Sequence, residues 1–137
     1  MVRVRNRTLN ADRRRWELNE ITERIIGCSF TVGRYLGCGF LEKVYENALT
    51  YELRQAGLFV EQQYEIEVQY KDVVVGKFVA DLLVEKRVLV ELKAVKYLDE
   101  IYFAQCLNYL KATNLNICLL INFGNPKVEF KRIVQNL

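Results

Sequence analysis

The stretch from Gly76 to Lys96, GKFVADLLVEKRVLVELKAVK, most constrains the fold, because charged residues stand among two strongly apolar runs. Residues 78–85 and 88–92 are rich in Val and Leu, and a turn-like charged tripeptide separates them, so they predict two adjacent buried strands. One of these strands carries Asp81 and the other carries Glu91. Acids inside an apolar sheet are costly unless they are paired or bind a metal, so these two require a partner.

The tripeptide Glu91-Leu92-Lys93 adds a basic group to this pair of acids. Side chains alternate along a strand, so the carboxylate and the ammonium lie on one face and Leu92 lies on the other. Two carboxylates beside a Lys are typical of Mg²⁺-dependent phosphodiester chemistry. A cross-strand salt bridge between Glu91 and Lys93 is the plain alternative.

The length of 137 residues fits one domain, which we place at residues 16–137. Residues 1–15 form an Arg-rich arm with six Arg against one Asp, and it either contacts phosphates or is a solvated leader. No apolar run is long enough to span a bilayer, and the start lacks the apolar segment of a secretory signal. We therefore expect a cytoplasmic protein with no membrane partner.

The sequence has four cysteines and no His. The cysteines show no CxxC spacing, so we interpret them as buried apolar residues in a reducing compartment rather than as a zinc site. The lack of His excludes Ser-His-Asp and Cys-His catalysis. Acid-base chemistry would depend on carboxylates, Lys, Tyr or water.

Hydrophobic periodicity predicts two helices, three strands, a third helix and two further strands. Asn114 is the expected stop of the third helix, and Lys71-Asp72 is the expected turn between the first two strands. This order favours an α/β (α+β) fold with a mixed central sheet flanked by helices. The predicted helices are 11–36, 40–56 and 98–113, and the predicted strands are 59–70, 73–85, 87–95, 116–123 and 127–134.

The order of these elements and their motifs resembles the PD-(D/E)XK nuclease superfamily. Asp81, nine residues, Glu91, one residue and Lys93 match its D-x9-ExK pattern, and Glu42 stands in the helix before them. The segment 39–45, GFLEKVY, resembles the motif of the GxxExxY family within that superfamily. The resemblance covers about residues 20–134 and implies a restriction-endonuclease-like αβββαβ core.

The resemblance also implies a metal site and its chemistry. Asp81, Glu91 and the backbone carbonyl of Leu92 would bind Mg²⁺ or Mn²⁺, with Glu42 as a further ligand, directly or through water. Lys93 would position or deprotonate the attacking water, or offset charge on the phosphorus. The catalytic set would be Asp81, Glu91, Lys93 and Glu42.

Three more residues are expected at the substrate. Gln105 and Tyr109 match the QxxxY element of RecB-like nucleases and would contact the substrate strand or brace the site, and Tyr45 belongs to the GxxExxY motif. Both tyrosines are at helical spacing, so the alternative is that they are core aromatics. The chain departs from the family pattern in Ala80, which replaces the Pro, and in its lack of His.

The function indicated is a metal-dependent nuclease that hydrolyses phosphodiester bonds, with DNA as the expected nucleic-acid partner. The alternative is a catalytically silent module on a nuclease fold that binds nucleic acid or oligomerises, because a fold does not fix a function. A homodimer, the choice between DNA and RNA, and internal or terminal cutting are left open by the sequence.

Overall fold

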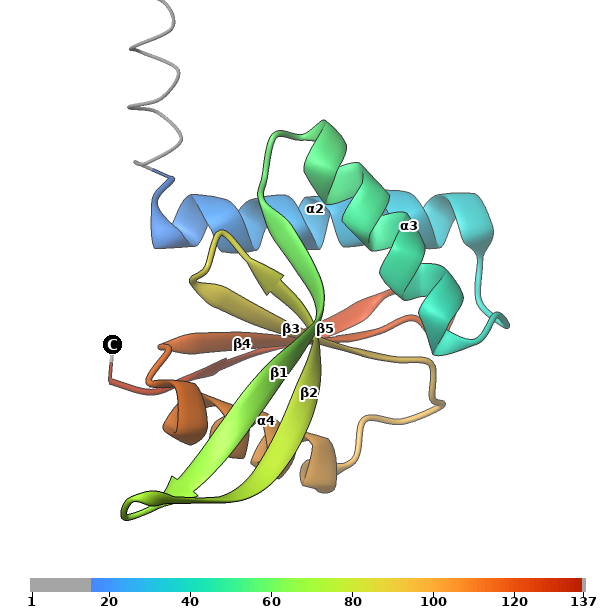
Figure 1. The fold of residues 1–137 in the computed structure, drawn as a ribbon. Coiled ribbons are helices and arrows are strands. Elements are labelled where there is room, and N and C mark those ends of the chain that lie inside the picture. Colours follow the sequence, from blue (N-terminus) through green and yellow to red (C-terminus); the bar gives the residue numbers. More distant parts are fainter. Residues whose placement is uncertain (1–15, 137) are drawn as a thin grey trace, which may run out of the picture.

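The computed structural model describes residues 16–136, and the predicted Arg-rich arm lies outside them. Every predicted element within that range is present, in the predicted order (Figure 1). The helices are α2 (Leu18–Leu36), α3 (Glu42–Gln55) and α4 (Glu100–Thr113). The strands are β1 (Val60–Tyr70), β2 (Val73–Val84), β3 (Val88–Lys93), β4 (Ile117–Asn122) and β5 (Glu129–Val134).

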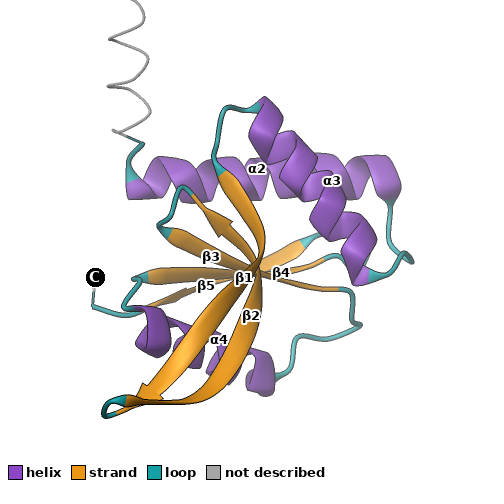
Figure 2. Cartoon of the chain, viewed as in Figure 1, coloured by secondary structure: helices purple, strands orange, loops and turns teal. Residues whose placement is uncertain are grey.

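The five strands form one mixed sheet in the order β1-β2-β3-β4-β5 (Figure 2). All neighbours are antiparallel except β3 and β4, which are parallel. Parallel neighbours need a long crossover, and α4 supplies it between the end of β3 and the start of β4. This confirms the predicted α/β class and the restriction-endonuclease-like arrangement.

The helices cover both faces of the sheet, with α2 and α3 on one face and α4 on the other (Figure 1). Each face has its own apolar core. Buried side chains alternate between these cores along β3, since Val90 and Leu92 pack under α2 and α3 whereas Leu89 packs under α4. The prediction that side chains alternate between the two faces of the sheet along this strand, with Leu92 on the face away from its neighbours, is therefore confirmed.

The hairpin of β1 and β2 extends well beyond the other described strands (Figure 2). It joins the wide sheet at its base, where residues 82–84 of β2 pair with β3. Its turn is at Lys71 and Asp72, as predicted, and Lys71 has a φ of 54°. Ile66 and Phe78 lie opposite each other in the projecting half, and Ile66 is buried in the core beside α4. The hairpin thus depends on α4 for its packing.

Several predicted boundaries were too wide. The predicted strand 87–95 ends at Lys93, because the backbone of Val95 bonds to the side chain of Asn122 instead of to a neighbouring strand. The third helix begins at Glu100, later than the predicted residue 98, with Asp99 as its N-cap. It ends at Thr113, and Asn114 follows as the C-cap with a left-handed φ of 63°, as predicted. No helix among residues 16–136 is long and apolar enough to cross a membrane.

The prediction that all four cysteines are buried was wrong for Cys38. Cys38 lies exposed between two glycines of positive φ, Gly37 and Gly39, in the loop before α3. The other three cysteines are buried, and all four are free thiols.

Candidate active site

Strands β2 and β3 separate at Asp81 and Glu91, and we call the gap between these two residues the fork. The ladder between β2 and β3 pairs Leu82 with Val90 and stops there, so the next two positions, Asp81 and Glu91, are not strand partners. Side-chain alternation is also interrupted, because Ala80 and Leu83 both pack in the core beside α4. The apolar residues around Asp81 therefore do not follow the period of two that an uninterrupted strand would have.

Two carboxylates replace the missing strand pairing across the fork. The backbone amide of Asp81 donates a hydrogen bond of 2.9 Å to Oε1 of Glu91. The backbone amide of Leu92 donates a hydrogen bond of 2.7 Å to Oδ2 of Asp81. Within residues 16–136, Oδ1 of Asp81 and Oε2 of Glu91 accept no hydrogen bond, so each acid keeps an oxygen available for a ligand.

The surroundings of the fork disfavour negative charge. Burial, and then the charge of Asp81, raise the pKa of Glu91 to about 8. Burial also raises the pKa of Asp81, against the hydrogen bond from Leu92, and the charges of Glu46 and Glu42 add to the increase. Two acids that repel each other in a poorly solvated place favour a proton or a cation between them.

Lys93 is at the end of β3 and on the same face as Glu91. Its Nζ lies 4.5 Å from the centre of the Tyr102 ring of α4. The positive charge of Lys93 lowers the pKa of both Asp81 and Glu91, which partly offsets their burial. The structure thus brings Lys93 near the acids and holds it against an aromatic ring.

Helix α3 presents a second acid that the sequence interpretation missed. Glu42, the predicted ligand, is the first residue of α3 and is exposed. Glu46 lies one turn further along, is 3% exposed, and affects the pKa of Asp81 more strongly than Glu42 does. Only its spacing of four from Glu42, on the same helical face, could have indicated it.

Glu46 is held by three side chains. Lys43 pairs with it at 3.2 Å, and Nε2 of Gln62 and Nε2 of Gln63 each donate a hydrogen bond of 2.8 Å to it. The β1 residue Gln63 has a φ of 54°, and the ladder passes from Gln62 to Tyr64 without it. The partner that the register would give Gln63 is Asp81. Backbone strain therefore lies directly beside the fork.

The comparisons with known proteins agree with this fold. The family model of the PD-(D/E)XK nuclease superfamily matches residues 19–133. This chain belongs to the PD-(D/E)XK nuclease superfamily. The crystal structure of SSO0001 is similar in fold, with a TM-score of 0.56 and 20% identity, over 92% of this chain and 62% of that one. The chain therefore spans less than two thirds of SSO0001, and no curated protein matches it.

PD-(D/E)XK nucleases generally use divalent metal ions, and the donor set at the fork fits one in part. Carboxylate oxygens are the ligands that Mg²⁺ and Mn²⁺ prefer, and Asp81 and Glu91 each offer one. Across residues 16–136, however, no group of three His, Cys, Asp or Glu side chains is gathered closely enough to hold a metal. Glu42 is therefore not assembled with the other two acids.

The predicted substrate residues of this superfamily member differ in exposure. Tyr45 is fully buried, and its hydroxyl donates to the carbonyl of Gly37 at 2.6 Å, so it braces the core and the loop before α3. Tyr109 is 2% exposed and donates to the carbonyl of Val79 at 3.4 Å. Burial raises the pKa of Tyr109, which keeps the phenol protonated. Gln105 is half-buried, and no described side chain or backbone group hydrogen-bonds its amide.

Proposed function

We propose that this member of the PD-(D/E)XK superfamily is a metal-dependent nuclease of the GxxExxY type, which hydrolyses phosphodiester bonds of DNA. The observation that carries the proposal is the fork at Asp81 and Glu91. There, two acids approach each other across a gap in the sheet, and each keeps an oxygen without a hydrogen bond in the described structure. Ordinary strand pairing would have closed this gap.

Asp81 and Glu91 would hold the metal with the carbonyl of Leu92, and Glu42 would contribute through water. A divalent cation bound there lowers the pKa of a bound water and offsets charge on the phosphate. Neutral Glu91 must give up its proton before it can be a ligand, because its pKa is about 8 in the metal-free protein.

Lys93 would orient the attacking water or stabilise charge on the phosphate from the end of β3. Its contact with the Tyr102 ring limits its rotation, so the ammonium is held in place before substrate arrives. Gln105 would donate to the substrate backbone, since its amide has no partner in the described part of the chain. Tyr109 and Tyr45 would act by bracing, because both are buried.

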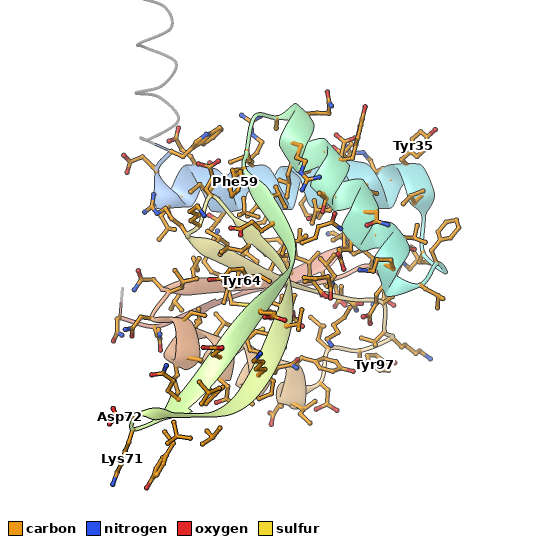
Figure 3. The ribbon with its side chains drawn as sticks, viewed as in Figure 1. Tyr35, Phe59, Tyr64, Lys71, Asp72 and Tyr97 are labelled. Atoms are coloured by element: carbon orange, nitrogen blue, oxygen red, sulfur yellow. The ribbon has the colours of Figure 1, made fainter. Side chains whose placement is uncertain are left out.

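Cleavage assays test the proposal. Purified protein is incubated with labelled linear, circular and branched DNA and with RNA, in Mg²⁺, Mn²⁺ or EDTA. We expect cleavage in Mg²⁺ or Mn²⁺, none in EDTA, and none by Asp81→Asn. Asp72→Asn is the matched control, because Asp72 lies at the tip of the hairpin (Figure 3) and far along β2 from Asp81. This variant should cleave like wild type.

Two results would count against the proposal. Cleavage that survives in Asp81→Asn would remove the fork from the mechanism. Metal-dependent binding of DNA without cleavage of any substrate would identify a silent module on a nuclease fold instead.

A further inference from the structure

Two loops are anchored at the end of the sheet where β3 and β4 finish. The loop 37–41 leads directly into α3 and Glu42, and the loop 94–99 follows Lys93. Figure 1 shows both loops on the same side of the molecule. Each loop is therefore continuous with a residue of the proposed site.

The first loop is fixed through Tyr45. The Tyr45 hydroxyl donates to the carbonyl of Gly37 at 2.6 Å and accepts from the backbone amide of Phe40 at 3.2 Å. The Tyr45 ring stacks on Phe123, the residue after β4, with centroids 4.6 Å apart. Phe40 packs edge-on against the same Tyr45 ring at 6.2 Å. Phe40 thus has a defined position rather than a free one.

The second loop is fixed through Asn122, at the end of β4, and through Asn125 in the turn that follows. The Asn122 side chain accepts from the Val95 amide at 3.0 Å and donates to the Val95 carbonyl at 2.8 Å. Nδ2 of Asn125 donates to the carbonyl of Lys96 at 3.0 Å. Gly124 leaves no room for a side chain against the backbone of Val95, so the two segments lie in close contact.

Both loops present aromatic rings to solvent. Tyr97 is 75% exposed and Phe40 is 48% exposed. Nζ of Lys96 lies 5.6 Å from the centre of the Tyr97 ring. Phe40 packs through one edge, and Tyr97 is largely unpacked. Their apolar faces are held on anchored loops that lead into Glu42 and follow Lys93, and they suit a planar ligand with a phosphate.

We infer that the site takes an unpaired nucleic-acid strand, whose bases stack on Tyr97 and Phe40 while the phosphate lies at the fork. This inference rests on the proposed function. A base offers its face to a side chain only when it is unstacked, which a single strand allows and a continuous duplex does not. Lys96 adds a cation next to the stacked base and its phosphate.

The chain contains two matched controls. Tyr70 is 64% exposed, with Nζ of Lys71 at 5.5 Å from its ring, and Phe59 is 52% exposed, with Nζ of Lys86 at 5.2 Å. Figure 3 shows Lys71, next to Tyr70, and Phe59 well apart from Tyr97. All three pairs have the same chemistry, and of the three the Tyr97 pair is the one on the loop that directly follows Lys93.

The experiment measures binding by fluorescence anisotropy in Ca²⁺, with a 16-nucleotide single-stranded DNA, the same sequence as RNA, and the matching DNA duplex. We expect tighter binding of a single strand than of the duplex. Tyr97→Ala and Phe40→Ala should each weaken single-strand binding by about 5- to 100-fold, the worth of one stacked base. Tyr97→Trp should restore it, while Tyr70→Ala and Phe59→Ala should match wild type.

Cleavage of the same three substrates in Mn²⁺ separates this inference from the proposed function. Equal binding of duplex and single strands, or an equal loss in Tyr70→Ala and Tyr97→Ala, overturns the inference even if the enzyme cuts. Aromatic-dependent binding of a single strand without any cleavage overturns the proposed function and supports the inference. The DNA and RNA arms show which kind of strand is held.

Discussion

Nε2 of Gln63 donates a hydrogen bond of 2.8 Å to Oε1 of Glu46, and this contact joins α3 to the strand position beside Asp81. Gln63 has a φ of 54°, whereas its neighbour Gln62, which also donates to Glu46, is not among the residues with positive φ. The two glutamines share a hydrogen-bond partner and differ in backbone conformation. Substitutions at the two positions therefore distinguish the contribution of the hydrogen bond to Glu46 from that of the strained backbone of Gln63.

Whether Gly or Val gives the more stable protein should differ between positions 62 and 63. At Gln63, Gly should be more stable than Val by about 1 to 2 kcal/mol, because a β-branched residue is strained at positive φ. At Gln62, Val should be the better residue, because Gly weakens an ordinary strand position. Urea unfolding of the four variants measures this, and the same order at both sites would contradict the strain.

Removing the charge of Glu46 should destabilise the protein. Glu46→Gln replaces an acceptor oxygen by an amide that faces the amides of Gln62 and Gln63, so we expect a loss of about 1 to 3 kcal/mol in the free energy of unfolding. Lys43→Met is the control, because the Lys43 side chain is 58% exposed and its ion pair is worth under about 1 kcal/mol. Equal losses in both variants would assign the effect to the ion pair.

Substitutions of Asp81 should separate metal binding from strand pairing. Asp81→Asn keeps an oxygen that can accept from the Leu92 amide, so its stability should stay within about 1 kcal/mol of wild type. Asp81→Ala leaves that amide without its acceptor and should cost about 1 to 3 kcal/mol. Both should lose binding of Mn²⁺ in calorimetric titration. Strong Mn²⁺ binding by Asp81→Asn would place the metal elsewhere.

Glu91 should make the metal-free protein less stable as the pH rises. Its folded pKa of about 8 lies above the ordinary value of 4.5, so the folded state holds a proton that the unfolded state has lost between these values. The stabilisation that this proton gives the folded state is fully present below about pH 4.5 and is lost as the pH rises through about 8. Between these values the free energy of unfolding falls by up to about 1.4 kcal/mol per pH unit. Urea unfolding in EDTA at several pH values measures it, and Glu91→Gln should flatten the dependence.

Tyr45→Phe should destabilise the loop before α3. The change removes the hydroxyl that bonds to both Gly37 and Phe40, and we expect a loss of about 1 to 2 kcal/mol in thermal or urea unfolding. Tyr51→Phe is the control, because Tyr51 is 61% exposed on α3, and it should lie within about 0.5 kcal/mol of wild type. If Tyr45→Phe leaves the stability unchanged, the aromatic ring alone fixes the loop.

The sequence predicted elements whose signals are local. Asn114 ends a helix because its side chain tolerates a left-handed φ, and the strands of Asp81 and Glu91 are apolar because both faces of the sheet are covered. The role of Glu46 was missed because two of its partners come from β1, sixteen and seventeen residues away. In the sequence it is one more charged residue on an amphipathic helix.

The fork itself had a signal that pattern analysis does not interpret. Alternation fails around Asp81, and such a failure can mean a bulge, an edge or a gap between strands. In the folded chain, two carboxylates bridge a gap between strands there. The positive φ of Gln63 had no sequence signal at all, since Gln is not a residue that usually adopts it.

The hairpin beyond the fork has a mechanical consequence. Among the described strands its outer half pairs only within the hairpin, and its remaining packing is on α4, for example through Phe78 against Tyr109 at 5.8 Å. Asp81 is at its base and spans the joint with Glu91. A displacement of the hairpin relative to β3 would therefore change the spacing of the two acids.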